Sequence, residues 1–332
     1  LTADVLAEAR RQGASSAEVA AHSDVGLSAT VRLGEPETIE HTRDNSLSIS
    51  VYFGQHKGTA STAELSAGAI QEAVSAACSI ARYTAEDDCA GLADAELMAT
   101  EFPDLQLYHP WDLDIEQALS LATECEAAAR GHDARITNSE GATLQSGMAV
   151  GVYGNTHGFV HGYPSSRHSL SCSVIAQQQD SMQRDYWYTT ARSPAALAQP
   201  AAVGERAAQR ALARLHGRKL KTRQAPVLFR AEVATGLLNS LVQAISGSAL
   251  YRRASFLLDA LHSRIFPQWV NIEENPQLLQ GLSSAAFDAE GVTTRRKPLV
   301  SDGVLQSYVL GSYSARKLGM QTTGNAGGVR NL

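Results

Sequence analysis

In the segment Ser46-Leu47-Ser48-Ile49-Ser50-Val51-Tyr52-Phe53, side chains with a hydroxyl group alternate with purely apolar side chains. Successive side chains of a strand point to opposite faces, so this alternation is typical of a strand with one buried face. Residues 27–32 alternate in the same way, and polar turn residues lie between the two segments at 34–36 and 43–45. The pattern predicts an antiparallel meander with a turn at each of these two places.

Helical patterns flank this meander and then return further along the chain. Residues 2–12 form an amphipathic pattern that ends at Gly13, and apolar residues recur at helical spacing from Leu65 to Tyr83. The same order then repeats as a helix over 114–130 with Asp114 as its N-cap, at least four strands over 134–190, and helical residues over 193–216. The sequence therefore predicts an α+β fold in which antiparallel β-meanders are flanked by helices.

The chain of 332 residues is long enough for two or three domains. The irregular stretch from Thr84 to Asp112 and a short basic linker at 218–224 suggest the boundaries. We expect an N-terminal α+β domain at 1–100, a central helix–meander–helix domain at 101–222, and a mixed, β-rich C-terminal domain at 223–332 that is incomplete in this chain. This last domain is expected to open with a strand at 226–229 and a helix at 231–245.

Composition narrows the classes of partner. The net charge is -6, so the chain as a whole does not attract phosphate backbones, and no stretch has the ~18 consecutive apolar residues of a membrane span. The four cysteines are scattered without CxxC spacing, which argues against a zinc ribbon or a disulfide framework. We therefore expect a cytoplasmic protein that binds neither nucleic acid nor a membrane.

Three histidines form the strongest candidate for a metal site from residue types alone. His157 and His161 are four residues apart, and His168 lies nearby. In a strand, however, residues i and i+4 are about 13 Å apart, which is too far for one ion. A stand-alone enzyme with a metal at these histidines is kept as an alternative, while polar side chains on a hairpin are the simpler interpretation.

Longer motifs in the last third of the chain point to a known family. The segments 300–310, 312–319 and 322–328, which read VSDGVLQSYVL, SYSARKLG and TTGNAGG, closely resemble the PmbA (TldE) branch of the TldD/PmbA family. Further matching segments are Glu232–Leu237, Tyr251–Arg252, Ser255–Asp259, Asp88–Leu92, Arg135–Ser139 and Arg167–Leu170. The resemblance covers essentially the whole chain. It implies a cytoplasmic component of a peptidase that works as a TldD–PmbA pair on leader or unfolded peptides.

The metal-binding branch of that family carries an HExxxH helix, whose two histidines bind zinc and whose glutamate activates water. In this sequence the two histidine positions hold Arg230 and Thr235, and the glutamate position holds Ala231. Glu232 remains in the stretch but has no adjacent ligand. The resemblance therefore implies a subunit with no metal or other cofactor of its own, whose zinc is supplied by a TldD-like partner.

These considerations define the expected function. We expect a heterodimer with a TldD-like subunit, an extended peptide substrate that adds to a sheet edge, and a homodimer as an option for the chain alone. No catalytic residue is assigned, and the expected peptide or partner cleft contains Arg230, Glu232, Thr235, Arg252, Asp259, Asn325, Gly327 and Gly328. The alternative is a metal-independent peptide-binding or gyrase-modulating protein with no peptidase role.

Overall fold

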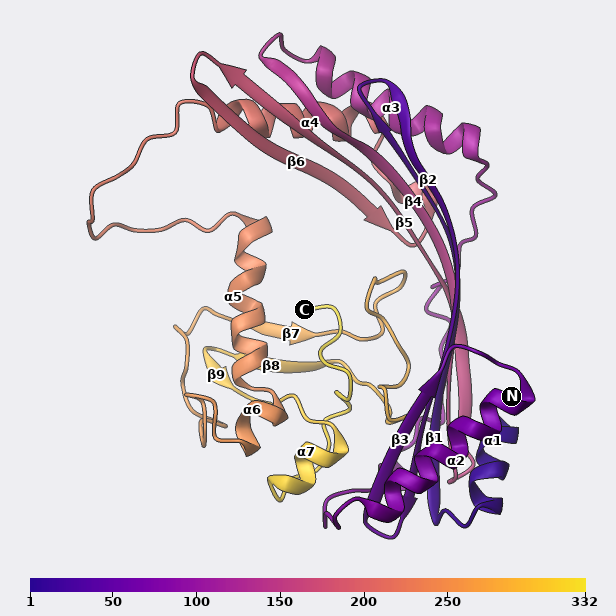
Figure 1. Cartoon of the computed structure of the whole chain (residues 1–332). Coiled ribbons are helices and arrows are strands. Elements are labelled where there is room, and N and C mark those ends of the chain that lie inside the picture. The colour runs from indigo at the N-terminus through magenta and orange to yellow at the C-terminus, as the bar shows by residue number, and fades with distance from the viewer.

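One curved antiparallel sheet of six strands runs through the first two thirds of the chain (Figure 1). The computed structural model describes residues 1–332. The strands lie in the order β3-β2-β1-β4-β5-β6, and each neighbouring pair is antiparallel. Their bounds are β1 Ser16–Arg32, β2 Glu35–Phe53, β3 His56–Thr62, β4 Ile136–Asn155, β5 Val160–Gln178 and β6 Ser181–Ala191.

The pairing of β1 with β4 joins the two predicted meanders into a single sheet. Their register is unbroken from Glu18 opposite Asn155 to Val31 opposite Ala142. The α+β class with an antiparallel sheet flanked by helices is confirmed. The division of residues 1–222 into two domains stays a prediction, although the sheet itself is continuous across it.

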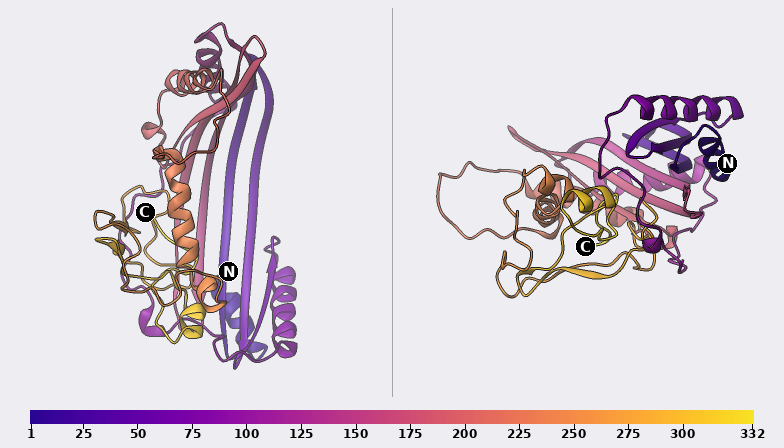
Figure 2. Two further views of the ribbon diagram at one scale, coloured as in Figure 1. Left: turned by 90° about the vertical axis from the view of Figure 1, so that its left-hand side faces the viewer. Right: turned by 90° about the horizontal axis from the view of Figure 1, so that it is seen from below.

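Four helices cover the convex face of the sheet at its two ends, as both views show (Figures 1 and 2). They are α1 Thr2–Arg11 and α2 Ala67–Tyr83 at one end, and α3 Ile115–Gly131 and α4 Pro200–Ala213 at the other. Val19, Ala29 and Val31 occupy alternate positions of β1 and are fully buried in the two cores beneath these helices. Burial of one face thus explains the period-2 pattern in the sequence.

The starts of two helices follow from their capping residues. The Asp114 side chain accepts a hydrogen bond from the Gln117 backbone N–H and completes a capping box at α3, which confirms the predicted N-cap. Ser66 caps α2 in the same manner through the Ala69 N–H. Small residues then let the layers approach closely, since a Cβ added at Gly204 of α4 would lie 2.0 Å from the Cys125 carbonyl oxygen.

Two expectations about the sheet are wrong. The turn predicted at 43–45 lies inside β2, where Asp44 pairs with Asp24 of β1. Residues 35–44 are exposed, so their polar composition reflects solvent on both faces of the strand rather than a turn. Residues 134–190 form three strands instead of at least four, because β4 alone is 20 residues long.

The last third of the chain forms a separate layer on the concave side of the sheet (Figures 1 and 2). We call residues 222–332 the C-terminal segment. Its elements are α5 Ala231–Ala244, α6 Gly247–Tyr251, α7 Ser312–Lys317, and the three-stranded sheet of β7 Ile272–Glu274, β8 Lys297–Ser301 and β9 Val304–Leu305. Two further 3-10 turns, Ala95–Leu97 and Pro194–Ala196, lie in connections. The helix predicted at 231–245 is confirmed, but the strand predicted at 226–229 is wrong, because this run is exposed and pairs with no strand.

Aromatic packing holds the C-terminal segment against the sheet. Phe287 packs on Phe159, with ring centroids 5.2 Å apart, and both belong to a core cluster that includes Tyr153 of β4 and Met98. The concave face is thereby covered near this cluster. None of the helices combines the length and the apolar character that crossing a bilayer requires.

Candidate functional site

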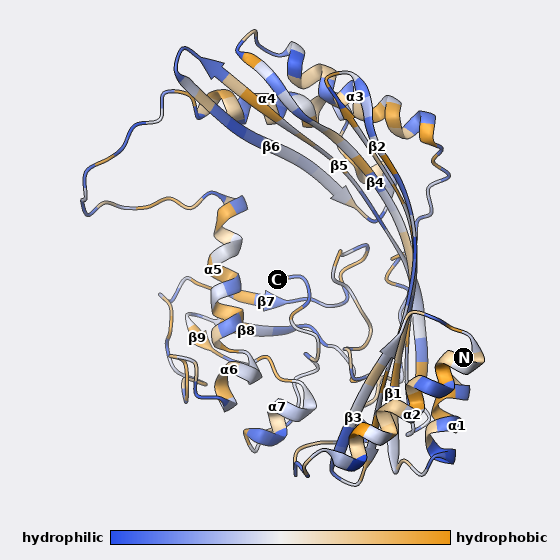
Figure 3. Ribbon diagram, in the orientation of Figure 1, coloured by the Kyte–Doolittle hydropathy of each residue, from blue (hydrophilic) through white to orange (hydrophobic).

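The N-terminus of α5 is where the resemblance places the zinc motif of the metal-binding branch. Arg230 is the N-cap residue, and Glu232 lies in the first helical turn. Val233 and Leu237 are 60% and 53% exposed on the same helix, and Leu228 before it is 92% exposed. Hydrophobic residues recur along α5 (Figure 3), and the rest of the chain leaves Val233 and Leu237 uncovered while it buries Leu241 and Ala244 near the end of the helix.

Ion pairs occupy Glu232 and connect α5 to the sheet layer. The Arg230 Nη2 donates to Glu232 Oε1 at 3.3 Å, and the Arg210 Nη1 of α4 donates to the same oxygen at 3.2 Å. The Arg210 Nε also donates to Asp185 of β6 at 3.2 Å. A hydrogen bond from the backbone at Glu232 lowers the pKa of this carboxyl below its usual value, and the nearby guanidinium groups of Arg230 and Arg210 lower it further.

These side chains do not fit a zinc ion. Arg230 offers only N–H donors, Ala231 has no ligating atom, and Thr235 uses its hydroxyl to donate to the Glu232 carbonyl oxygen at 3.0 Å. A cation placed beside Glu232 would also be repelled by two guanidinium groups. No group of three or more His, Cys, Asp or Glu side chains in the structure is arranged to hold a metal ion.

The three histidines of the alternative metal hypothesis do not converge. His157 lies in the turn between β4 and β5, and His161 stacks on Phe102 with ring centroids 3.5 Å apart. His168 is buried, with Nδ1 at 2.9 Å from the Ser146 hydroxyl and Nε2 at 2.9 Å from the His109 carbonyl oxygen. Since His161 and His168 are seven residues apart on one strand, they point to opposite faces of the sheet.

The remaining residues of the expected cleft lie in two other places. Arg252 follows α6, which begins after the C-terminal end of α5, and α5 itself is about 21 Å long. Its guanidinium covers the Tyr251 ring at 5.5 Å. Asp259 occupies a left-handed turn position with φ of 57°. The structure therefore brings Arg230, Glu232 and Thr235 together but leaves Arg252 and Asp259 apart from them.

The glycine-rich loop at 324–328 is held in place by hydrogen bonds to a buried carboxylate. The Asn325 Nδ2 donates to both oxygens of the buried Glu274, at 2.8 and 3.0 Å. The same carboxylate receives the Arg330 backbone N–H at 2.6 Å and pairs with Lys297 at 3.1 Å. Gly327 and Gly328 have positive φ, which the turn after Asn325 requires. Asn325 is 3% exposed, so its side chain is turned into the protein.

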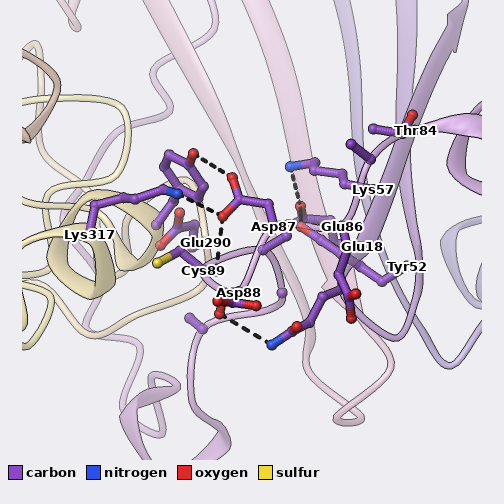
Figure 4. Close-up of a pocket in the computed structure, with 16 residues that line it drawn as sticks. Glu18, Tyr52, Lys57, Thr84, Glu86, Asp87, Asp88, Cys89, Glu290 and Lys317 are labelled. Carbon is purple, nitrogen blue, oxygen red and sulfur yellow. Dashed lines mark hydrogen bonds and ion pairs between the residues drawn. The ribbon is translucent and has the colours of Figure 1, made fainter. Parts of the chain in front are cut away.

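A cavity that sequence reasoning missed lies elsewhere, between the concave sheet face and the C-terminal segment. It measures about 810 Å³. Five carboxylate side chains and two lysines line it (Figure 4): Glu18, Glu86, Asp87, Asp88, Glu290, Lys57 and Lys317. The sequence offered only one weak signal, the acidic pair at 87–88, since the lining residues are up to 299 positions apart.

Two networks hold the walls of this cavity. The Lys317 Nζ and the Tyr313 hydroxyl of α7 donate to Asp87 at 2.8 and 2.7 Å, and these contacts lower the pKa of Asp87 to about 2. On the opposite wall, the Tyr52 and Tyr153 hydroxyls donate to Glu18 at 2.8 and 3.0 Å. Burial, reinforced by the Glu18 charge, raises the pKa of both tyrosines, so they remain donors at neutral pH.

Comparison with known proteins assigns the whole chain to one family. Models of the three successive domains of the PmbA/TldA metallopeptidases match residues 17–81, 108–215 and 222–332. A metalloprotease PmbA homolog of Haemophilus influenzae is 50% identical over 98% of this chain and 72% of its own length. Metalloprotease PmbA of Escherichia coli O157:H7 is 49% identical over 99% of this chain and 73% of its own length.

Solved structures agree with this assignment. A candidate modulator of DNA gyrase from Bacteroides thetaiotaomicron matches with a TM-score of 0.92 and 25% identity, over 98% of this chain and 74% of its own. TldE from Thermococcus kodakarensis matches with a TM-score of 0.79 and 16% identity, over 99% of this chain and 75% of its own, and so shows the same fold.

Proposed function

Because this chain belongs to the PmbA/TldD metallopeptidase family, we propose that it is the non-catalytic subunit of a TldD–PmbA zinc peptidase acting on leader or unfolded peptides. The observation that carries the proposal is the arrangement at α5, where Arg230, Ala231 and Thr235 provide no zinc ligand. Glu232 is paired with Arg210 and Arg230 and so is not poised as a general base. Catalytic zinc is then supplied by a TldD-like partner.

Exposed apolar residues around α5 support a partner surface at this place. Val227 and Leu228 are 70% and 92% exposed, and Val233 and Leu237 continue the apolar surface along α5. Contiguous exposed apolar residues of this kind mark protein–protein contacts. The peptide is proposed to add to the open edge of β6, where Tyr186 and Tyr188 are stacked and more than half exposed.

The proposal is tested by mixing the purified protein with a TldD-like subunit and assaying cleavage of an unfolded peptide. Neither subunit alone should cleave, and activity should appear on mixing. A Val233→Asp/Leu237→Asp variant should weaken assembly at least tenfold, while a Tyr83→Ser variant on the opposite face should assemble normally. Cleavage by this protein alone would contradict the proposal. Normal assembly of the double variant would remove the partner surface from α5 without affecting the peptidase assignment.

A gyrase-modulating role without peptidase activity is the second candidate, supported by the description of the Bacteroides relative as a candidate modulator of DNA gyrase. Its test is the gyrase supercoiling assay with the pure protein. A change in supercoiling rate together with an absence of cleavage in the mixed sample would favour it.

A further inference from the structure

A second cavity between the sheet and the C-terminal segment carries charge of the opposite sign to the first. It measures about 440 Å³, and Arg192, Arg330 and Tyr163 line it. Asp288 is the one carboxylate among the lining residues. Its oxygens are already used by backbone N–H groups, including Ala326 at 2.9 Å and Val292 at 3.0 Å. The two arginines therefore give the cavity a positive charge.

The Arg330 side chain has no partner in the protein. Its Nε is buried without a hydrogen bond, and only its backbone N–H is used, in the bond to Glu274. No carboxylate lies within ion-pair distance of its guanidinium. Buried N–H groups of charged side chains are nearly always satisfied. Because Arg330 lines the cavity and none of its guanidinium N–H groups is used within the protein, they are free to donate to an acceptor that binds there.

Arg192 is fixed in place but not neutralised. Its guanidinium donates to the backbone carbonyl oxygens of Ser166 at 2.9 Å, Leu282 at 2.6 Å and Gly281 at 3.4 Å. Carbonyl oxygens orient the group without supplying a negative charge. Burial lowers the pKa of Arg192, and the charge of Arg167 lowers it further. Both effects are relieved when an anion binds beside it.

Hydroxyl groups complete the lining. Ser46 and Ser48 of β2 and Ser165 of β5 face the cavity, and the charges of Arg330 and Arg192 both act on the Tyr163 hydroxyl. Arginine forks with neighbouring hydroxyl donors match the geometry of a planar carboxylate. The cavity opens on the same concave side of the sheet as the larger acidic one.

We propose that this cavity binds a carboxylate of the peptide substrate, held by Arg330 and Arg192. The carboxylate comes from the C-terminus of the peptide or from an acidic side chain, and the two sources share one chemistry. The inference rests on the proposed function only in taking a peptide as the ligand. In this proposal Arg330 determines which peptides bind, and the partner subunit cleaves the peptide bond.

Fluorescence anisotropy with three labelled peptides of one unstructured sequence tests the proposal on this protein alone. One peptide has a free C-terminal carboxylate and no acidic residue, the second a C-terminal amide and one glutamate, and the third a C-terminal amide and no acidic residue. The first or the second should bind at least about tenfold more tightly than the third, as expected for a charge-assisted contact. Which of the two binds identifies the source of the carboxylate.

Variants then locate the contact. Arg330→Gln should abolish the difference between the peptides, Arg330→Lys should keep part of it, and Arg295→Gln, at an exposed arginine outside the cavity, should leave it unchanged. Equal binding of all three peptides, no binding of any, or a difference that survives Arg330→Gln would overturn the inference. None of these results affects the peptidase assay with the partner, so the failure of one proposal is distinguishable from the failure of the other.

Discussion

Arg230 and Glu232 form an ion pair at 3.3 Å across the N-cap of α5, and Arg210 contacts the same carboxylate oxygen at 3.2 Å. Two guanidinium groups thus contact the one acidic side chain in the first turn of α5. A carboxylate held in this way remains ionised and links α5 to α4, and we expect that it does not activate water.

Replacement of Glu232 distinguishes these two roles. In the assembled complex, Glu232→Gln should keep at least a tenth of the wild-type kcat, because only ion pairs are lost. Removal of a general base costs on the order of 10²- to 10⁴-fold. Steady-state cleavage of an unfolded peptide measures the difference, and a loss of 100-fold or more in kcat would show that Glu232 takes part in catalysis.

Glu126 ties the β1–β2 turn to α3. It is 1% exposed, and its two oxygens accept the backbone N–H groups of Leu33 and Gly34, both at 2.8 Å. Glu126→Ala should lower the free energy of unfolding by about 1–3 kcal/mol, since hydrogen bonds to a buried charged group are lost. Urea denaturation measures this, with Glu124→Ala on the exposed side of the same helix as the control. Equal stability of the two variants would contradict the role of Glu126.

Two helical glycines should respond to alanine with opposite signs. Gly204→Ala puts a Cβ 2.0 Å from the Cys125 carbonyl oxygen and should destabilise the protein by about 1–3 kcal/mol. Gly236 of α5 has open space around it, so Gly236→Ala should stabilise by about 0.5–1 kcal/mol through helix propensity. Thermal unfolding of both variants checks the pair, and destabilisation by Gly236→Ala would show that α5 is packed more closely than described.

Asp288 should give the protein a specific pH dependence. Burial raises the pKa of this carboxyl to about 6, against 3.8 in the unfolded chain. Its contribution to stability is therefore fully present below pH 3.8 and is lost as the pH rises through 6. Between pH 4 and 7 the wild type should lose up to about 3 kcal/mol relative to Asp288→Asn. Urea titrations at several pH values measure this difference, and a constant difference would contradict the raised pKa.

Much of the fold could be predicted from local patterns. The spacing of apolar residues predicted α2, Asp114 predicted the start of α3, and the helix expected at 231–245 is α5. The turn at 43–45 and the strand at 226–229 were wrong because both patterns depend on what covers the segment. An exposed strand resembles a turn in composition, and an apolar run without a sheet partner forms no strand.

The candidate sites could be predicted only in part. The resemblance could point to Arg230, Ala231 and Thr235, because the zinc motif of the metal-binding branch is local in sequence. The cavities depend on contacts across the whole chain, such as Tyr313 with Asp87, which are 226 residues apart. A local sequence pattern does not indicate such contacts. The buried hydrogen bonds of Asn325 could not be predicted for the same reason, since its partner Glu274 is 51 residues away.

We propose that this protein supplies no catalytic metal to the peptidase. Zinc content and peptidase activity measured on the same samples test it most directly: this protein alone, a TldD-like subunit alone, and the two mixed. We predict less than about 0.1 zinc per chain and no cleavage for this protein alone, and one zinc per pair with full activity after mixing. One zinc per chain, or cleavage without the partner, would contradict the account.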